Sequence, residues 1–354
     1  MILKERNLSV DLAKTFAILC VIMTHVIEAT YPMQVEDYGF MPSWLVAGMP
    51  LYSVGRLGVP IFMFLTGYLL LDREYTPEKA VGFWKSNLLR LLITTELWIL
   101  LYFFFTAYYY HQPLDFFKLL EEVLFFKRPD INHLWYMGQI LGIYLFLPIV
   151  SCVLRNLNRQ TIVLIFSVSF VFAFLPSTVN PLLAIIMRNP LYSQVNVSFS
   201  GGIYGLMVIA GWGIKRGFFD GVKSWLAAAV GAASFACVLG IQYLSCKHWI
   251  TYNVWYDYAF LVIASFCVLL LILRCRPSVC KRLIVWLGYS SFGVYLIHKG
   301  LLLVFYRWQL TFLPELPHMI EIPLLFALTL ITSELCVYLL SRKKEAKRLL
   351  FFMK

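Results

Sequence analysis

Residues 9–31 read SVDLAKTFAILCVIMTHVIEATY, and this stretch decides the fold class. It is apolar over a length that can cross a bilayer as a helix, which takes about 20 residues. It nevertheless carries Asp11, Lys14 and His25. An ionisable group in the hydrocarbon region is costly, and it usually faces the interior of a helix bundle or a water-filled cavity. The segment therefore predicts a membrane-spanning helix whose polar side chains point into the protein.

The same apolar character extends over the whole chain. Of its 354 residues, 60% are hydrophobic and only 14% are charged, whereas soluble domains are about 25% charged. Apolar runs of this length read as spanning helices, because every backbone polar group must be satisfied inside lipid. We predict an all-α polytopic membrane protein, a single transmembrane domain over residues 1–354. The expected spans are 8–30, 49–71, 88–110, 134–154, 160–176, 197–214, 224–245, 254–273, 283–306 and 320–341, with long loops at 31–48, 111–133 and 177–196 and the fifth span ending at Pro176.

The basic residues indicate how these spans are oriented. The net charge is +11, but most Lys and Arg stand in short clusters between apolar runs. With the N-terminus inside, 21 of the 30 Lys and Arg fall in inner segments, 6 in outer loops and 3 (Lys14, Arg56, Lys299) within spans. Inner loops of membrane proteins are enriched in Lys and Arg. The pattern predicts cytoplasmic N- and C-termini and is not that of a nucleic-acid-binding surface.

One face of the first span carries a polar stripe. Asp11 and Lys14 are three residues apart, so they share a face and can pair. Lys14 and His25 are eleven apart, which is close to three full turns, so they share a face at a separation of about 16 Å. A reaction that takes a charged donor from one side and serves an acceptor on the other would use this layout. A Lys that extends to the headgroups and a His at the outer interface would fit equally well.

The second and third spans add two further ionisable residues. Arg56 lies in the outer part of the second span, and it needs a partner because arginine cannot lose its charge. A carboxylate, a substrate phosphate or developing negative charge would serve. Glu96 in the third span could orient a His or Arg by a charge-assisted hydrogen bond, or form a purely structural pair.

Candidate binding residues open the fourth span and lie within the ninth. His133, Trp135 and Tyr136 mark an outer interface, where aromatic residues are common in any membrane protein. His298 and Lys299 fall near the middle of the ninth span, where a Lys must face a cavity or reach the interface. Phosphate-loop, dinucleotide-binding, zinc-protease and serine-hydrolase motifs are missing from the sequence. The spacing of His and Cys predicts no metal site.

Four segments resemble the acyltransferase family 3 membrane proteins when taken in order. Asp11, Lys14 and His25 match the family's opening Asp-x-x-[Arg/Lys] and later His, with Lys where many members have Arg. The other three are GRLGVPIFMFLTGYLL (55–70), HLWYMGQILGIYLFLPIV (133–150) and LGYSSFGVYLIH (287–298). The resemblance covers nearly the whole chain, in the form without an additional extracellular domain.

This resemblance implies a bacterial enzyme of the cytoplasmic membrane. Its donor would be acyl-CoA, most often acetyl-CoA, bound as a substrate with no permanently bound cofactor. Its acceptor would be a sugar hydroxyl of a surface or lipid-linked glycan. His25 would act as general base or take the acyl group transiently. Asp11 and Lys14 would organise the inner end, and Arg56 would stabilise negative charge or hold the acceptor.

The remaining candidate residues and a second function class stay open at this point. Glu96, His133, Trp135, Tyr136 and His298 would contribute to substrate binding, with the aromatic rings suited to sugar. A transporter or exporter of a glycan or small molecule would also have ten spans with intramembrane charges. Such transporters often consist of two halves with matching broken helices, and the sequence shows no such pairing.

Overall fold

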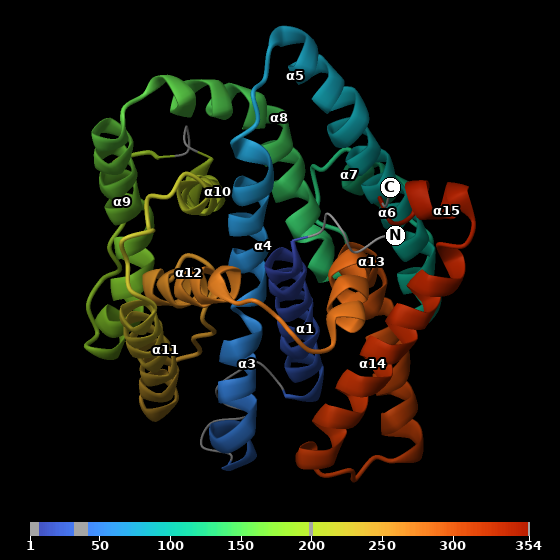
Figure 1. Ribbon diagram of the computed structural model, residues 1–354. Helices are drawn as coiled ribbons and strands as arrows, with labels where there is room; N and C mark the ends of the chain where they lie inside the picture. The colour runs from blue at the N-terminus through green and yellow to red at the C-terminus, as the bar shows by residue number, and fades with distance from the viewer. Residues whose placement is uncertain (1–6, 32–41, 198–200, 353–354) are drawn as a thin grey trace.

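The computed structural model describes residues 7–31, 42–197 and 201–352, and within them all regular structure is helical (Figure 1). In these residues, eight helices are long and apolar enough to cross a membrane, and α10 and α12 are shorter apolar helices. The predicted all-α polytopic membrane architecture is confirmed. The elements are α1 (Leu8–Thr30), η1 (Trp44–Gly48), α3 (Met49–Gly55), α4 (Gly58–Thr66), η2 (Gly67–Leu71), α5 (Pro77–Phe83), η3 (Trp84–Leu88), α6 (Leu89–Tyr110), α7 (Phe116–Val123), η4 (Asn132–Leu134), α8 (Trp135–Asn156), α9 (Arg159–Ile185), α10 (Gly202–Lys215), α11 (Ser224–Lys247), α12 (Ala259–Arg274), α13 (Lys281–Phe312), α14 (His318–Leu340) and α15 (Lys344–Leu349).

Each predicted span overlaps one of these helices, but some predicted boundaries are wrong. α9 does not end at Pro176, since it continues through Pro176 and Pro181 to Ile185. A proline removes one backbone hydrogen bond, and a membrane helix tolerates this where local adjustments satisfy the freed carbonyl. The predicted loop 111–133 contains the short helix α7. Most of the predicted loop 31–48 lies outside the described residues.

α1 is the central helix of the bundle (Figure 1). The side chain of Asn7 caps its first turn by accepting hydrogen bonds from the backbone N–H groups of Ser9 and Val10. Its sides pack against α3, α4, α12, α13 and α14. Polar side chains on α1 therefore project toward neighbouring helices, as the cost of placing them in lipid requires.

The second span is broken where Arg56 stands. α3 ends at Gly55 and α4 begins at Gly58. Pro60 has no N–H group, so it cannot make the helical bond to the carbonyl of Arg56 four residues earlier. On Gly58, a Cβ would come within 2.5 Å of the carbonyl oxygen of Ala17 on α1. The glycine thus lets the broken helix lie directly against α1, and the break brings Arg56 toward the bundle centre.

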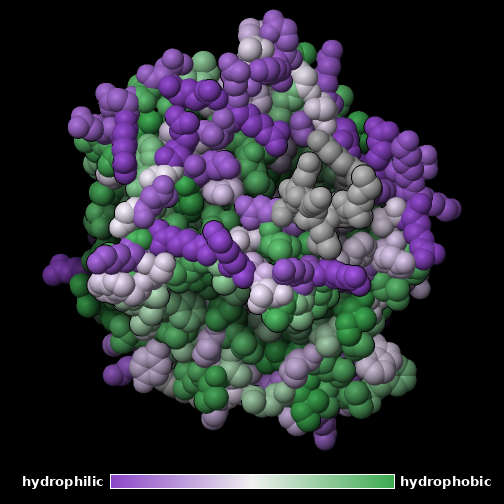
Figure 2. All heavy atoms as spheres, in the orientation of Figure 1, coloured by the Kyte–Doolittle hydropathy of each residue, from purple (hydrophilic) through white to green (hydrophobic). Residues whose placement is uncertain are grey.

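The surface has a polar part and an apolar part. Figure 2 shows hydrophilic side chains over the upper part of one face and mainly hydrophobic side chains over its lower part. Large apolar side chains of α9 are exposed, among them Leu164, Ile165 and Val168. A soluble protein rarely exposes such a continuous apolar surface, so this surface fits contact with lipid.

Candidate active site

Glu28 on α1 joins two of the predicted site residues. Its Oε2 lies 2.8 Å from Nδ1 of His25, one turn earlier on the same helix. Its Oε1 accepts a hydrogen bond of 2.9 Å from Nη2 of Arg56. Because an ionised carboxylate can only accept, the proton of the imidazole lies on Nδ1. The basic nitrogen of His25 is then Nε2, and the hydrogen bond from Nδ1 to Glu28 holds the ring in its orientation.

Aromatic rings surround the Arg56 guanidinium. Its Nη1 donates to the hydroxyl of Tyr256 at 3.1 Å, and Nη2 also bonds to the hydroxyl of Tyr52. The guanidinium carbon lies 4.6 Å from the ring centre of Tyr52 and 4.7 Å from that of Trp255. Cation–π contacts with desolvated cations are worth about 2 kcal/mol. Arg56 is only 4% exposed, and these contacts offset the cost of burying its charge.

Lys299 adds a second cation to this site. Its Nζ lies 3.4 Å from Nδ1 of His25. Glu28, Arg56 and Lys299 together carry one negative and two positive formal charges. In a region of low dielectric, an excess positive charge favours a negatively charged ligand or a reacting atom that becomes negative.

Three histidine rings meet beside Lys299. The ring centre of His298 lies 5.3 Å from that of His25 and 5.2 Å from that of His133. Nδ1 of His298 lies 2.7 Å from the carbonyl oxygen of Tyr295, so it carries the proton. Among the described residues, Nε2 of His298 has no hydrogen-bond partner. No group of three or more His, Cys, Asp or Glu in residues 7–31, 42–197 and 201–352 is arranged to hold a metal ion.

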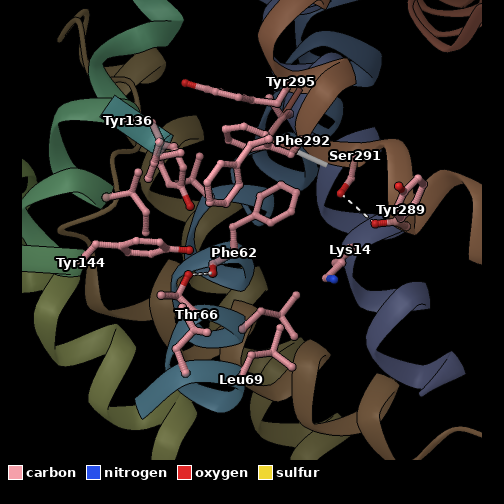
Figure 3. A pocket seen from close by; sticks show the side chains of 18 of the residues that line it. Lys14, Phe62, Thr66, Leu69, Tyr136, Tyr144, Tyr289, Ser291, Phe292 and Tyr295 are labelled. Carbon is pink, nitrogen blue, oxygen red and sulfur yellow. Dashed lines mark hydrogen bonds between the residues drawn. The ribbon is translucent and has the colours of Figure 1, made fainter. Parts of the chain in front are cut away.

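A cavity of about 340 Å³ is lined by Tyr295, whose ring also contacts His133 and His298 of the histidine cluster. Figure 3 shows side chains of α1, α4, α8 and α13 converging on it, including Lys14, Tyr136 and Tyr295. The hydroxyl of Tyr295 donates to the carbonyl oxygen of His133 at 2.7 Å. The two tyrosines therefore line the cavity where it approaches the histidines.

The other end of the cavity is basic. Arg73 lies just after η2, and its carbonyl oxygen accepts a hydrogen bond from Ser151 near the end of α8. Tyr136, Tyr144 and Ser151 follow one another along α8, so Arg73 and Tyr136 are separated by several turns of that helix. Lys14 also lines the cavity (Figure 3). The cavity thus extends from cationic side chains to the aromatic wall beside the histidines.

Asp11 and Glu96 lie apart from the histidine cluster. Asp11 is buried where α1 packs against Gly288 of α13, next to the cavity wall. Glu96 is half-buried on α6 and contacts neither a histidine nor an arginine among the described residues. The two roles considered for Glu96, orienting a His or Arg and forming a structural pair, therefore stay predictions. It lies two residues before Trp98, which places it about 200° around the helix from that buried side chain.

Three of the residues predicted to bind substrate, His133, Trp135 and Tyr136, have separate environments. His133 is 1% exposed and lies inside the bundle against His298. Trp135 stacks on Tyr256 with ring centres 5.6 Å apart, and it also packs against Trp255. Tyr136 faces the cavity. Successive residues of a helix point about 100° apart. His133 therefore lies in the histidine cluster, Trp135 packs on the aromatic residues around Arg56, and Tyr136 lines the cavity.

Sequence reasoning missed Glu28, Tyr52, Trp255 and Tyr256. The spacing His25-x-x-Glu28 was the available signal, because residues three apart on a helix face each other. The stretch TYNVWYDY (251–258) is rich in aromatic residues at a predicted span boundary. It shows no period that would place its rings against Arg56, since it precedes α12 as irregular chain.

Comparison with known proteins assigns the chain to a family. The family model described as an acyltransferase domain, that of acyltransferase family 3, matches residues 7–341. No curated protein and no solved structure gives a significant match. The matched region contains His25, Glu28 and Arg56, and every residue named as a cavity lining above. The chain therefore belongs to the acyltransferase family 3 of membrane proteins.

Proposed function

We propose that this membrane acyltransferase moves an acetyl group from acetyl-CoA to a sugar hydroxyl of a cell-surface or lipid-linked glycan. The observation that carries the proposal is that Tyr295 lines the cavity and also contacts His133 and His298, the histidines packed against His25. The enzyme would work in the bacterial cytoplasmic membrane with both termini in the cytoplasm, the orientation that the distribution of Lys and Arg favours.

In this proposal, the cavity receives the donor. Its basic end, with Lys14 and Arg73, would face the cytoplasm and attract the phosphate groups of acetyl-CoA. The thioester would extend toward Tyr136 and Tyr295, next to the histidines. The apolar middle of the cavity, with Phe62 and Leu65, suits the uncharged pantetheine arm.

His25 acts as the general base. Nε2 removes the proton of the acceptor hydroxyl as its oxygen attacks the thioester carbonyl carbon. The carbon–oxygen bond forms, the carbon–sulfur bond breaks, and the proton passes from Nε2 to the leaving sulfur to give CoA. Glu28 holds the imidazole in the productive tautomer and stabilises the imidazolium that forms, a role well established for carboxylates behind catalytic histidines.

Arg56 and Lys299 supply positive charge. The carbonyl oxygen becomes negative in the tetrahedral intermediate, and fixed cations in a site of low dielectric stabilise that charge. Glu28 neutralises only one of the two, which leaves one net positive charge for the reacting group. Trp255 is 37% exposed, and with Trp135 it would provide an aromatic surface for the acceptor sugar.

The test is release of CoA by the purified protein in nanodiscs. Acetyl-CoA is supplied with and without a crude cell-envelope glycan fraction, and His25→Ala is run in parallel. Release that requires the glycan fraction and His25 is the expected result. Radiolabelled acetyl-CoA without acceptor should leave no label on the protein, because a general base forms no acyl-enzyme.

Two results would contradict the proposal in different ways. A monodisperse wild-type protein that neither binds CoA nor releases it would point to the transporter class. Label retained on wild-type protein but lost from His25→Ala would keep the activity and replace the general base by a transient acyl-histidine.

A further inference from the structure

The chain beyond the family match returns to the helix bundle. The match ends at residue 341, and α15 with Leu350–Phe352 follows. The Oγ1 of Thr94 on α6 donates to the carbonyl oxygen of Leu349 at 2.8 Å. Phe351 is 0% exposed and contacts the position of Gly293 on α13. This segment, Lys344–Phe352, is therefore inserted between α6 and α13.

Its last described residue forms part of the cavity wall. Phe352 lines the same cavity as Lys14 and Tyr289, and its ring lies 5.9 Å from that of Phe292. The guanidinium of Arg90 on α6 lies 5.1 Å from the ring centre of Phe352. Within the described chain, Nη2 of Arg90 is buried without a hydrogen-bond partner.

The segment also places one of its cations over a residue of the cavity wall. The Nζ of Lys347 lies 5.7 Å from the ring centre of Tyr289, a residue of the cavity wall. The neighbouring Arg348 is exposed and has no such contact among the described residues. The two side chains carry the same formal charge, but only Lys347 contacts a residue of the cavity wall.

We propose that Lys344–Phe352 is part of the donor site, forming part of the cavity wall with Phe352 and presenting Lys347 with Arg90 to the phosphate groups of the donor. This inference rests on the proposed function, because it takes an acyl-CoA as the occupant. According to this inference, residues outside the family match help to bind the nucleotide portion of that donor. Cations held over aromatic rings are well suited to this, since the ring restrains the side chain while the charge stays available.

Equilibrium binding of CoA to the full-length protein in nanodiscs tests the inference without knowledge of the acceptor. Lys347→Gln keeps an aliphatic stem over Tyr289 and removes the charge, and Arg348→Gln is the matched control. We expect Lys347→Gln to weaken CoA binding about tenfold, as loss of a charged contact does. Arg348→Gln should bind like wild type, and Lys347→Arg should restore most of the affinity.

The outcomes separate the inference from the proposed function. Equal CoA affinities for wild type, Lys347→Gln and Arg348→Gln would overturn the role of the segment, while wild-type binding would leave the proposed donor intact. If both Gln variants bound CoA more weakly by the same factor, the effect would come from the overall charge of the protein, and the inference would also be overturned. No CoA binding by monodisperse wild type would remove the proposed function, and the inference with it.

Discussion

Glu28 lies three residues after His25 on α1, and its Oε2 accepts a hydrogen bond from Nδ1 of that histidine at 2.8 Å. The other carboxylate oxygen is bonded to Arg56 at 2.9 Å. One side chain thus fixes both the imidazole tautomer and the position of the guanidinium. In the proposed reaction, Glu28 therefore positions both the general base and one of the two cations.

The first prediction concerns this carboxylate. Glu28→Gln is expected to lower kcat about a hundredfold, because a neutral amide stabilises neither the imidazolium nor the required tautomer. CoA release with saturating donor measures it. Glu96→Gln is the matched control, since it makes the same change in another apolar span without a partner among the described residues. Equal activities of the two variants would remove Glu28 from the mechanism.

The second prediction separates charge from geometry at Arg56. Lysine keeps the charge but lacks the planar fork, so it cannot reproduce the two separate nitrogens with which Arg56 bonds to Tyr256 and Glu28. We expect Arg56→Lys to lower kcat at least about tenfold, with the protein still monodisperse. Arg307→Lys is the control, because Arg307 also lies over an aromatic ring, that of Tyr109, away from the site. Wild-type turnover in Arg56→Lys would mean that charge alone suffices.

The sequence predicts those features of the fold that the membrane requires. Long apolar runs, and the contrast between basic loops and apolar spans, identify the helices without any knowledge of their packing. The predicted end of the fifth span at Pro176 was wrong, because a proline that would end most helices of soluble proteins is tolerated inside α9. Helix bounds that depend on such local compensation cannot be read from composition.

The candidate site was predictable only one helix at a time. The sequence marks His25, Arg56 and His298 as ionisable residues inside apolar runs. In the structure, His298 packs against His25, and Arg56 is bonded to Glu28 one turn from His25. Which carboxylate serves them depends on helix rotation and packing. Sequence reasoning considered Glu96 and missed Glu28, and the packing of the broken second span on α1 is what brings Arg56 to Glu28.

The third prediction concerns Lys14 at the basic end of the cavity. Lys14→Ala should raise the KM for acetyl-CoA about tenfold with a smaller change in kcat, because Lys14 lies about three helical turns from His25 along α1 and would contact the donor phosphates. Lys14→Arg should retain most of the activity if charge is what matters. Lys79→Ala removes an exposed Lys that pairs with Glu74 at the surface. A KM shift of the same size there would show a general charge effect.

The fourth prediction uses two tyrosines on one face of α8 to locate the acyl group. Tyr136 lines the cavity beside Tyr295 and the histidines, whereas Tyr144 lines it two turns further along the helix, toward Arg73. Tyr136→Ala should open space where the acyl chain ends, so the rate with butyryl-CoA relative to acetyl-CoA should rise at least about tenfold. Tyr144→Ala removes the same ring from the same cavity near the pantetheine arm and should leave that ratio unchanged. A ratio that rises equally in both variants would mean that the cavity selects by total volume, and the acyl group would then have no fixed position beside His133 and His298.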